Sequence, residues 1–359
     1  MTVCILGNSL TALTLAKLLV NYDIDVDLIF NKKNYKINHT RTIGISKNNI
    51  DFFNTNIVNI EKLIWNIKKI EIFSENLKKK TLLNFEANKC QLFSIIKNFK
   101  LHQLLYNELS KSKFFRSKFL TEKNLSYLNK YELIINCDPF NFITKRYFSK
   151  KISKEYNSTA YTTIISHDKI INDTAVQIFT KKGPLAFLPI SNKKTSIVYS
   201  VHNSNNNGEE NIKELIKDNN FKYKIKDLEK INSFELKSFN LRSYYHKNIL
   251  AFGDLLHKVH PLAGQGFNMT IRDIKVLSEI IKKKLDIGLL LDSSVSLEFQ
   301  NKIKHKNFLF SNSIDLIHEF FNIERKTRTN FLSKSVKLIG SQPSINRMFT
   351  KIADKGILF

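Results

Sequence analysis

The segment "GDLLHKVHPLAGQGFNMTIRD", residues 253–273, concentrates special backbone in a chain that otherwise avoids it. The 359 residues include only 10 glycines and five prolines, yet three glycines and one proline fall here, with two of the nine histidines. Gly264 and Gly266 allow the backbone to approach a flat ligand, and Pro261 fixes a turn. The helical pattern that follows would direct its free N–H groups at negative charge on that ligand. Asp254, at the end of a predicted strand, is placed to accept hydrogen bonds from sugar-like hydroxyls.

The pattern along the chain predicts an α/β protein whose nucleotide-binding pieces are interrupted by an antiparallel sheet. Residues 2–30 have the strand, helix and strand spacing of a dinucleotide-binding unit. Residues 131–138 and 248–254 predict strands that each end on an acidic residue. Between them, residues 156–201 hold several strand-like runs separated by turn residues. Helices are predicted at 92–112, after a short strand or turn, at 210–229 and over most of 269–338, with a loop at 203–207.

The first glycine turn is a weaker signal than the opening segment. It runs from Gly7 to Ala12, with Ser9 and Ala12 at positions where glycines are usual. Small residues still allow the backbone to approach a pyrophosphate at a helix N-terminus. The alternative is a tight turn that only packs the helix on the strand. The carboxylate expected at the end of the second strand, which would bind a ribose, is replaced by Phe30.

The composition limits the class of protein without deciding it. The net charge is +25, from 57 basic and 32 acidic residues, which favours an anionic partner. The chain is also crowded with Lys, Asn, Ile and Phe, as expected from an AT-rich genome, so the charge can equally be mere composition. Because it has no arginine-rich arm, zinc pattern or ribonucleoprotein motif, no nucleic-acid partner is predicted.

The cysteines and the N-terminus favour a cytoplasmic protein. Cys4, Cys90 and Cys137 are widely spaced and predict neither a disulfide framework nor a metal site. A strand begins almost at once, without a charged leader, so no signal peptide is expected. No apolar run reaches the length of about 18 residues that a membrane span requires.

The opening segment resembles the motif G-D-x-x-H…P…G-Q-G-x-N…D of class A flavin-dependent aromatic hydroxylases, and it is most similar to their ubiquinone-biosynthesis branch. The matching residues are Gly253, Asp254, His257, His260, Pro261, Gly264, Gln265, Gly266, Asn268 and Asp273. Three further segments are similar to family motifs in the same order: "RTIGIS" at 41–46, "YNSTA…H" at 156–167 and "FTKKGPLAFLPI" at 179–190. The chain is identified as a member of that family on these residues.

The resemblance implies the FAD-binding doubly wound fold of the p-hydroxybenzoate hydroxylase type, with an inserted antiparallel substrate-domain sheet and a helical C-terminus. The first part of the FAD-binding domain would span residues 1–150, interleaved with substrate-domain strands near 57–85. The substrate domain would span 151–240, the second part of the FAD-binding domain 241–285, and a helical C-terminal region 286–359.

The resemblance also implies FAD as cofactor and NAD(P)H as electron donor. Asp254 would bind the ribityl chain of FAD, and Arg41 would lie near the cofactor. The residues expected at the pyrophosphate are Gly7, Ser9 and Ala12, and those expected around the isoalloxazine ring are Pro261, Gly264, Gln265, Gly266, Phe267 and Asn268. No catalytic residue is predicted, since His257 and His260 are expected to shape the loop rather than to act as general acids.

The sequence departs from the family at contacts with the cofactor, mainly on its adenosine side. The second fingerprint, G-A-D-G-x-x-S-x-x-R, reads "NCDPFNFITK" at 136–145 and keeps only Asp138. Pro139 replaces a glycine there and removes a backbone N–H. The other departures are Ser9, Phe30 and Phe99, the last of which stands where an arginine is usual.

The implied function is hydroxylation of the aromatic ring of a polyprenylated phenol in ubiquinone biosynthesis, with O2 as co-substrate. The protein would then be cytoplasmic and peripheral to the inner membrane, in contact with a ubiquinone-biosynthesis complex. The aromatic and basic stretch at 307–340 would lie on that membrane or, alternatively, pack against the flavin-binding domain. Because of the departures, a catalytically degenerate member that serves as a structural or lipid-presenting subunit is the alternative function. A flavin reductase or dehydrogenase on the same fold is a third.

Overall fold

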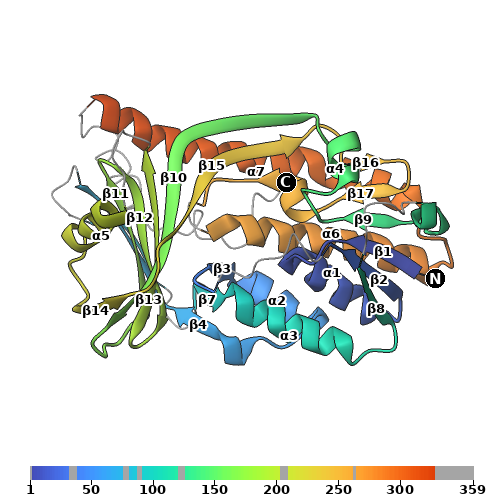
Figure 1. Cartoon of the computed structure of the whole chain (residues 1–359), viewed down its shortest axis with the longest axis horizontal. Helices are drawn as coiled ribbons and strands as arrows, with labels where there is room; N and C mark the ends of the chain where they lie inside the picture. The colour runs from blue at the N-terminus through green and yellow to red at the C-terminus, as the bar shows by residue number, and fades with distance from the viewer. Residues whose placement is uncertain are drawn as a thin grey trace.

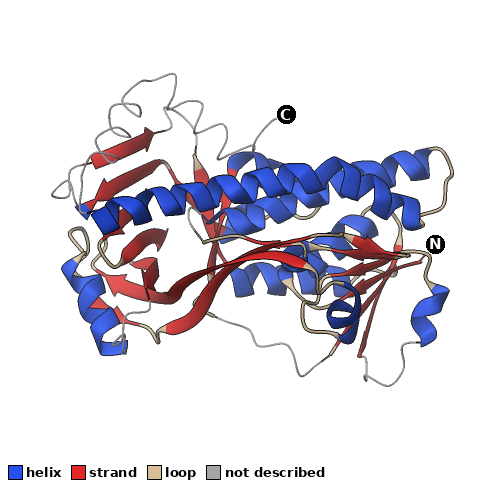
Figure 2. Cartoon of the chain, turned by 90° about the horizontal axis from the view of Figure 1, so that it is seen from above, coloured by secondary structure: helices blue, strands red, loops and turns tan. Residues whose placement is uncertain are grey.

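Two lobes build the molecule, and long elements run from one to the other (Figure 1). The computed structural model describes residues 2–31, 39–75, 81–86, 91–119, 126–202, 209–261 and 264–327. The 17-residue strand β10 (Lys151–His167), its neighbour β15 (Asn232–Leu241) and the 35-residue helix α7 (Ser293–Thr327) extend across both lobes (Figures 1 and 2). Among the described residues, no helix has both the length and the apolar character needed to cross a membrane.

The first lobe is built on a six-stranded sheet in the order β16-β17-β9-β1-β2-β8. β1 is central and runs parallel to β2 and to β9, and β17 runs parallel to β9. The strands are β1 (Thr2–Leu6), β2 (Asp25–Phe30), β8 (Phe115–Phe119), β9 (Ile134–Asn136), β16 (Tyr245–His246) and β17 (Ile249–Ala251). The helices of this lobe include α1 (Leu10–Val20), α3 (Asn98–Ser110), α4 (Phe142–Tyr147) and α6 (Gln265–Asp286).

The second lobe is built on a nine-stranded, largely antiparallel sheet, with α5 (Glu209–Asp218) packed on it (Figure 1). Its order is β18-β15-β10-β13-β12-β11-β5-β6, and β14 also pairs with β10. Its remaining strands are β5 (Lys69–Ser74), β6 (Thr81–Glu86), β11 (Thr174–Thr180), β12 (Gly183–Ser191), β13 (Lys194–His202), β14 (Ile225–Leu228) and β18 (His257–Lys258). Strands that precede residue 91 in the sequence and strands that follow residue 150 therefore share this sheet.

A three-stranded sheet, in the order β3-β7-β4, completes the strands. It consists of β3 (Thr42–Ser46), β4 (Ile64–Ile67) and β7 (Phe93–Lys97). The helix α2 (Lys47–Asn56) follows β3, and the short turn η2 (Glu61–Leu63) precedes β4. The short turns η4 (Ser126–Lys130) and η5 (Gly253–Leu255) lie in the first lobe.

Two predicted helices were too long. The helix predicted at 92–112 begins only at Asn98, because the β-branched run before it forms β7 and pairs with both β3 and β4. The helix predicted at 210–229 ends at Asp218, because residues 225–228 pair with β10 as β14. The loop predicted at 203–207 and Cys90 lie outside the described residues.

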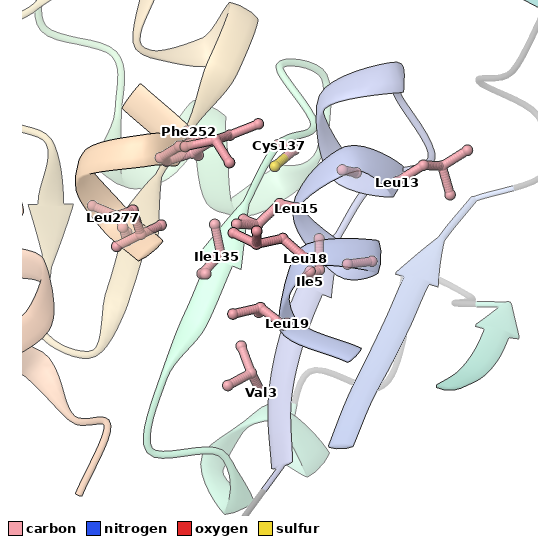
Figure 3. Close-up of a cluster of buried hydrophobic side chains, with 14 of the residues drawn as sticks. Val3, Ile5, Leu13, Leu15, Leu18, Leu19, Ile135, Cys137, Phe252 and Leu277 are labelled. Atoms are coloured by element: carbon pink, nitrogen blue, oxygen red, sulfur yellow. The ribbon is translucent and has the colours of Figure 1, made fainter. Parts of the chain in front are cut away.

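The core of the first lobe explains why the N-terminal strand is apolar on both faces. Residues 3–6 of β1 are all buried, as are ten of the eleven residues of α1. Figure 3 shows Leu15, Leu18 and Leu19 of α1 beside Ile5 of β1 and Ile135 of β9. A parallel strand covered on both faces needs such an uninterrupted apolar sequence.

Gly253, the first residue of the turn η5 that follows β17, lets the first turn of α1 pack against this turn. Its φ is +65°, and a Cβ on Gly253 would lie 2.6 Å from Cγ2 of Thr11. Both the backbone conformation and the space therefore require glycine at this position.

Gly253→Ala is expected to lower the free energy of unfolding by about 3 kcal/mol, since the left-handed conformation costs about 1–2 kcal/mol and the overlap with Thr11 adds about 1–3 kcal/mol. Gly288→Ala is the matched control, because Gly288 has φ +69° but no neighbour within 4 Å of an added Cβ. Urea unfolding measures both. Equal losses in the two variants would show that the contact with Thr11 has no energetic consequence.

Candidate cofactor site at the carboxyl edge of the first sheet

Three strand ends that are distant in sequence meet at one edge of the six-stranded sheet. The pairing register places Leu6 of β1 opposite Asn136 of β9, and Ala251 of β17 opposite the same Asn136. The carboxyl ends of parallel strands share one edge, so the loops that follow these three strands lie side by side. In open α/β sheets, ligands bind at this edge.

Gly7 brings the first two of these loops together. Its φ is +107°, and a Cβ at this position would lie 3.2 Å from both Cβ and N of Asp138. Next to Gly7, Oδ1 of Asn8 is buried and has no hydrogen-bond partner among the described residues. A buried acceptor of this kind is open to a hydrogen bond from a ligand or from water.

Ser9 caps the helix that starts at this edge. Its hydroxyl accepts a hydrogen bond from the N–H of Ala12 at 3.2 Å. A helix start leaves several N–H groups without partners, and this cap satisfies one of them. Ser9 and Ala12 thus lie at the start of α1, where one N–H donor is already used within the protein.

The loop after β17 carries the predicted carboxylate. Asp254 lies in the turn η5 and is exposed at the strand edge. Downstream, Gly264 has φ +62° and is the N-cap residue of α6. A Cβ on Gly264 would lie 3.6 Å from the backbone N of Gly44 in β3, so the start of α6 and β3 approach closely. Arg41 is exposed directly before β3, and Pro261 is half-buried before α6.

Asn268 fixes the start of α6 to β3 and α2. Its Nδ2 donates to the carbonyl oxygens of Gly44 at 3.0 Å and Gly264 at 3.3 Å. Its Oδ1 accepts from the N–H of Ser46 at 2.9 Å and from Nδ2 of Asn49 at 2.8 Å. Because the side-chain amide is occupied by protein partners, the structure gives Asn268 a positioning role beside the predicted ring site.

A buried ion-pair geometry holds the other side of α6. Nε2 of His257 lies 2.6 Å from Oδ2 of Asp273, and both side chains are about 1% exposed. Nδ2 of Asn307 donates to Oδ1 of Asp273 at 3.0 Å, which adds α7 to the group. These contacts agree with the expectation that His257 shapes the loop.

His260 lies in an aromatic cluster beneath the same loop. Its ring centre is 4.9 Å from that of Tyr156 in β10 and 4.5 Å from that of His318 in α7. The Tyr156 hydroxyl in turn donates to the carboxylate of Asp315. Burial, followed by the neighbouring His318 and His202, lowers the pKa of His260 from 6.5 to about 3. The ring is therefore the neutral imidazole near pH 7, not the imidazolium cation that would act as a general acid.

The adenosine side of the edge is built differently from the family pattern. Phe30 packs edge-to-face on Phe119 of β8, with ring centres 5.1 Å apart. The carboxylate of Asp27 on β2 is buried. It accepts hydrogen bonds from Arg116 and Lys118 of β8 and from the hydroxyl of Tyr131. Burial would raise the pKa of Asp27, but hydrogen bonds from these three partners lower it to about 2. Asp27 is thus committed within the protein and does not replace the missing ribose contact.

The altered second fingerprint forms an ordered turn through its own side chains. Asn141 caps α4 by accepting from the N–H of Thr144 at 2.8 Å, and its amide donates to Oδ1 of Asn136 at 2.8 Å. The hydroxyl of Thr144 donates to the carbonyl oxygen of Asp138 at 2.6 Å. The turn therefore keeps Asp138 next to Gly7 despite Pro139.

Sequence reasoning missed several of these partners. Asn141 has a local signal, since Asn followed by a short helical run is a common N-cap. Asn49 and its partner Asn268 are 219 residues apart, and Thr11 meets Gly253 only in the folded chain, so neither contact has a local signal. Within the described ranges, no group of three His, Cys, Asp or Glu side chains could hold a metal ion.

Comparisons with known proteins agree with this geometry. Residues 152–286 match the family model described as FAD binding domain. The chain is 24% identical over 242 residues to the mitochondrial ubiquinone biosynthesis monooxygenase COQ6 of Dictyostelium discoideum, covering 53% of this chain and 49% of that protein. It is 26% identical over 157 residues to the 3-demethoxyubiquinol 3-hydroxylase of Escherichia coli, covering 42% of this chain and 40% of that protein. The chain thus spans about half or less of the length of these two relatives.

Solved structures share the fold at low identity. The p-nitrophenol 4-monooxygenase PnpA of Pseudomonas putida has a TM-score of 0.79 at 10% identity, covering 99% of this chain and 100% of that chain. HpxO of Klebsiella pneumoniae, solved with FAD and uric acid, has a TM-score of 0.75 at 12% identity, covering 98% and 97% of the two chains.

The family model and the curated relatives, together with the shared fold, indicate a flavin-dependent hydroxylase. The match to the FAD binding domain and the curated relatives, which include ubiquinone-biosynthesis hydroxylases, agree with the resemblance to class A flavin-dependent aromatic hydroxylases. The predicted family, fold class and FAD cofactor are therefore confirmed.

The residues at the edge are compatible with FAD at the glycine turn. Gly7 and Gly264 bring the loop of Asp138 and strand β3 close to the two loops predicted to bind the cofactor, and the buried acceptor of Asn8 has no protein partner among the described residues. The aromatic pair of Phe30 and Phe119 offers apolar contact but no carboxylate to the ribose.

His260→Gln is expected to flatten the pH dependence of stability between about pH 6.5 and pH 3. The buried ring of His260 stays neutral in the native state over this range, whereas the unfolded chain binds a proton below pH 6.5. On acidification, this group alone therefore lowers the free energy of unfolding of the wild-type protein by about 1.4 kcal/mol per pH unit. His260→Gln lacks this contribution. His305→Gln on the exposed face of α7 is the control and should keep the wild-type slope. Urea unfolding at several pH values from 7 to 5 measures how the free energy of unfolding changes with pH. The same change in all three proteins would contradict the prediction.

Proposed function

We propose that this protein is an FAD-dependent monooxygenase that hydroxylates the aromatic ring of a polyprenylated phenol in ubiquinone biosynthesis, with NAD(P)H and O2. The observation that carries the proposal is that the glycine turn and the exposed Asp254 follow strands that end at one edge of the sheet, while the start of α6 lies against β3. The names of the curated relatives support the pathway and the type of reaction.

The site residues are assigned roles along the length of FAD. Asp254 would accept hydrogen bonds from the ribityl hydroxyls, and Arg41 would lie near the cofactor. Gly7, Ser9 and Ala12 would meet the pyrophosphate at the start of α1. Pro261, Gly264, Gln265, Gly266, Phe267 and Asn268 would surround the isoalloxazine ring.

FAD, when bound and reduced by NAD(P)H, would supply the activation of O2, and O2 is the source of the oxygen atom added to the phenol ring. The protein's part is to bind, to orient and to exclude water. The start of α6 would direct its N–H groups toward negative charge on the ring system. Asn268 and the pair of His257 with Asp273 hold that helix start in place, and neutral His260 adds no charge beneath the loop.

A lipid-tailed substrate would place the protein on the cytoplasmic face of the inner membrane, in contact with a ubiquinone-biosynthesis complex. The aromatic stretch proposed for membrane contact begins within α7. Phe310 is buried against Val259 and Met269, which supports the alternative that this part packs on the protein. Leu316 and Ile323 are exposed, and residues 328–340 lie outside the described residues.

A second candidate function is a family member without turnover that serves as a structural or lipid-presenting subunit. The observation that favours it is the adenosine side of the site, where Phe30 replaces the carboxylate and Pro139 removes a backbone donor.

Isotope incorporation separates the candidates. The purified protein is incubated with FAD, NAD(P)H, a short-chain prenylated phenol and ¹⁸O2. One ¹⁸O atom in the product ring supports the hydroxylase. NAD(P)H oxidation without incorporation identifies a reductase, and neither outcome with bound FAD identifies the non-catalytic subunit.

Asp254→Ala is expected to weaken FAD binding by about tenfold or more, because a hydrogen bond to a charged group contributes about 1.5–3 kcal/mol. Asp286→Ala is the control, since Asp286 is exposed at the far end of α6. Quenching of flavin fluorescence measures both dissociation constants. Unchanged affinity in Asp254→Ala would show that this carboxylate does not contact the cofactor.

A further inference from the structure

A surface around α4 has two features that the flavin site does not explain. Aromatic rings project from it into solvent: Phe140 is 68% exposed, Phe142 52% and Tyr147 37%. Large exposed aromatic rings that gather in one place mark an interaction site rather than ordinary surface. We call the surface formed by residues 139–151 and 242–247 the α4 surface.

The two segments of the α4 surface are in contact although almost 100 residues separate them. The ring of Tyr147 stacks on that of His246, with centres 4.1 Å apart and planes at 11°. The N–H of Arg242 donates to the carbonyl oxygen of Lys150 at 3.0 Å. Figure 1 shows α4 beside β16, at the side of the first lobe away from α5.

The charge of this surface has one sign. Residues 139–151 contain four basic side chains, residues 242–247 contain two, and neither segment contains an acidic residue. The guanidinium of Arg146 lies 5.8 Å from the ring centre of Phe142 and 5.3 Å from that of Tyr147, so cation and aromatic rings form one unit. Among the described residues, no salt bridge involves Lys145, Arg146, Lys150, Arg242 or Lys247. These cations are therefore available to an anionic partner.

We propose that the α4 surface binds an anionic phospholipid bilayer. Aromatic rings settle at the boundary between headgroups and acyl chains, and nearby lysine and arginine side chains pair with anionic headgroups. A bilayer also needs no shape complementarity, which suits a six-residue helix. The proposal rests on the proposed function in one respect: a polyprenylated phenol is held in a membrane, so an enzyme that acts on it benefits from docking there.

Vesicle flotation of the FAD-loaded full-length chain tests the proposal. Vesicles of phosphatidylcholine alone are compared with vesicles that contain about one third phosphatidylglycerol, at about 0.1 M salt, where exposed charges still act over about 10 Å. The wild-type protein is expected to float with the anionic vesicles and to remain behind with the neutral ones.

Arg146→Glu with Lys150→Glu is expected to lower the partition coefficient by about tenfold or more, because each cation near an anionic surface contributes about fivefold. Lys213→Glu with Lys217→Glu is the matched control, since it makes the same charge change on exposed positions of α5 in the other lobe. This control is expected to change the partition coefficient by less than about threefold, because only long-range electrostatic attraction to the vesicle is reduced. Equal losses in the two pairs would show that net charge alone binds the vesicles and would overturn the proposal, as would a wild-type protein that ignores anionic vesicles.

A tryptophan reporter places the contact. Phe142→Trp is expected to show a blue shift of its emission on addition of anionic vesicles, whereas Phe221→Trp, on the second lobe and 49% exposed in the native side chain, should show none. A shift in the second variant alone would assign the contact to another face. These measurements do not depend on turnover. A protein without hydroxylase activity that still binds vesicles through the α4 surface would contradict the proposed function, but it would support the proposal that this surface binds a bilayer.

Discussion

The parallel pairing of β1, β9 and β17 is the constraint on which the site depends. This pairing brings segments from the start, the middle and the last third of the chain to one edge, because parallel strands place their carboxyl ends together. Two glycines then allow the final approach. Gly7 admits the loop of Asp138, and Gly253 admits the first turn of α1. Without this convergence, Asp254 would be an ordinary surface carboxylate far from the glycine turn.

Buried polar contacts turn this edge into a defined site. Asn268 uses its whole amide to tie α6 to β3 and α2, while Asp273 ties the same helix to His257 and Asn307. Buried polar groups that all find partners specify one arrangement, since the unpartnered alternatives are costly. The helix start that faces the proposed isoalloxazine site is thus positioned from both sides. On the adenosine side, Asp27 is held by Arg116, Lys118 and Tyr131 within the protein, so the fold there does not depend on a contact between a carboxylate and the cofactor.

The sequence indicated the family, the doubly wound sheet and the position of the main loop, because these have local signals in glycine spacing and alternating apolar runs. Helix limits near β7 and β14 were wrong, because strand pairing with β3, β4 and β10 overrode a helical pattern. The contacts of Thr11, Asn49 and Asp315 could not be predicted, since each joins residues that are distant in sequence. The assignment of individual residues to parts of FAD and the domain limits remain predictions.

The most direct test of the account is hydrogen exchange of the backbone amides, measured by mass spectrometry with and without FAD. The account predicts that peptides covering residues 7–13, 136–142 and 253–267 gain protection together, since one ligand along the strand edge covers all three loops. Peptides from α5 should exchange at the same rate in both states. If FAD binds but protects another region, or only one of the three loops, then the strand ends do not form the cofactor site and the central claim is wrong.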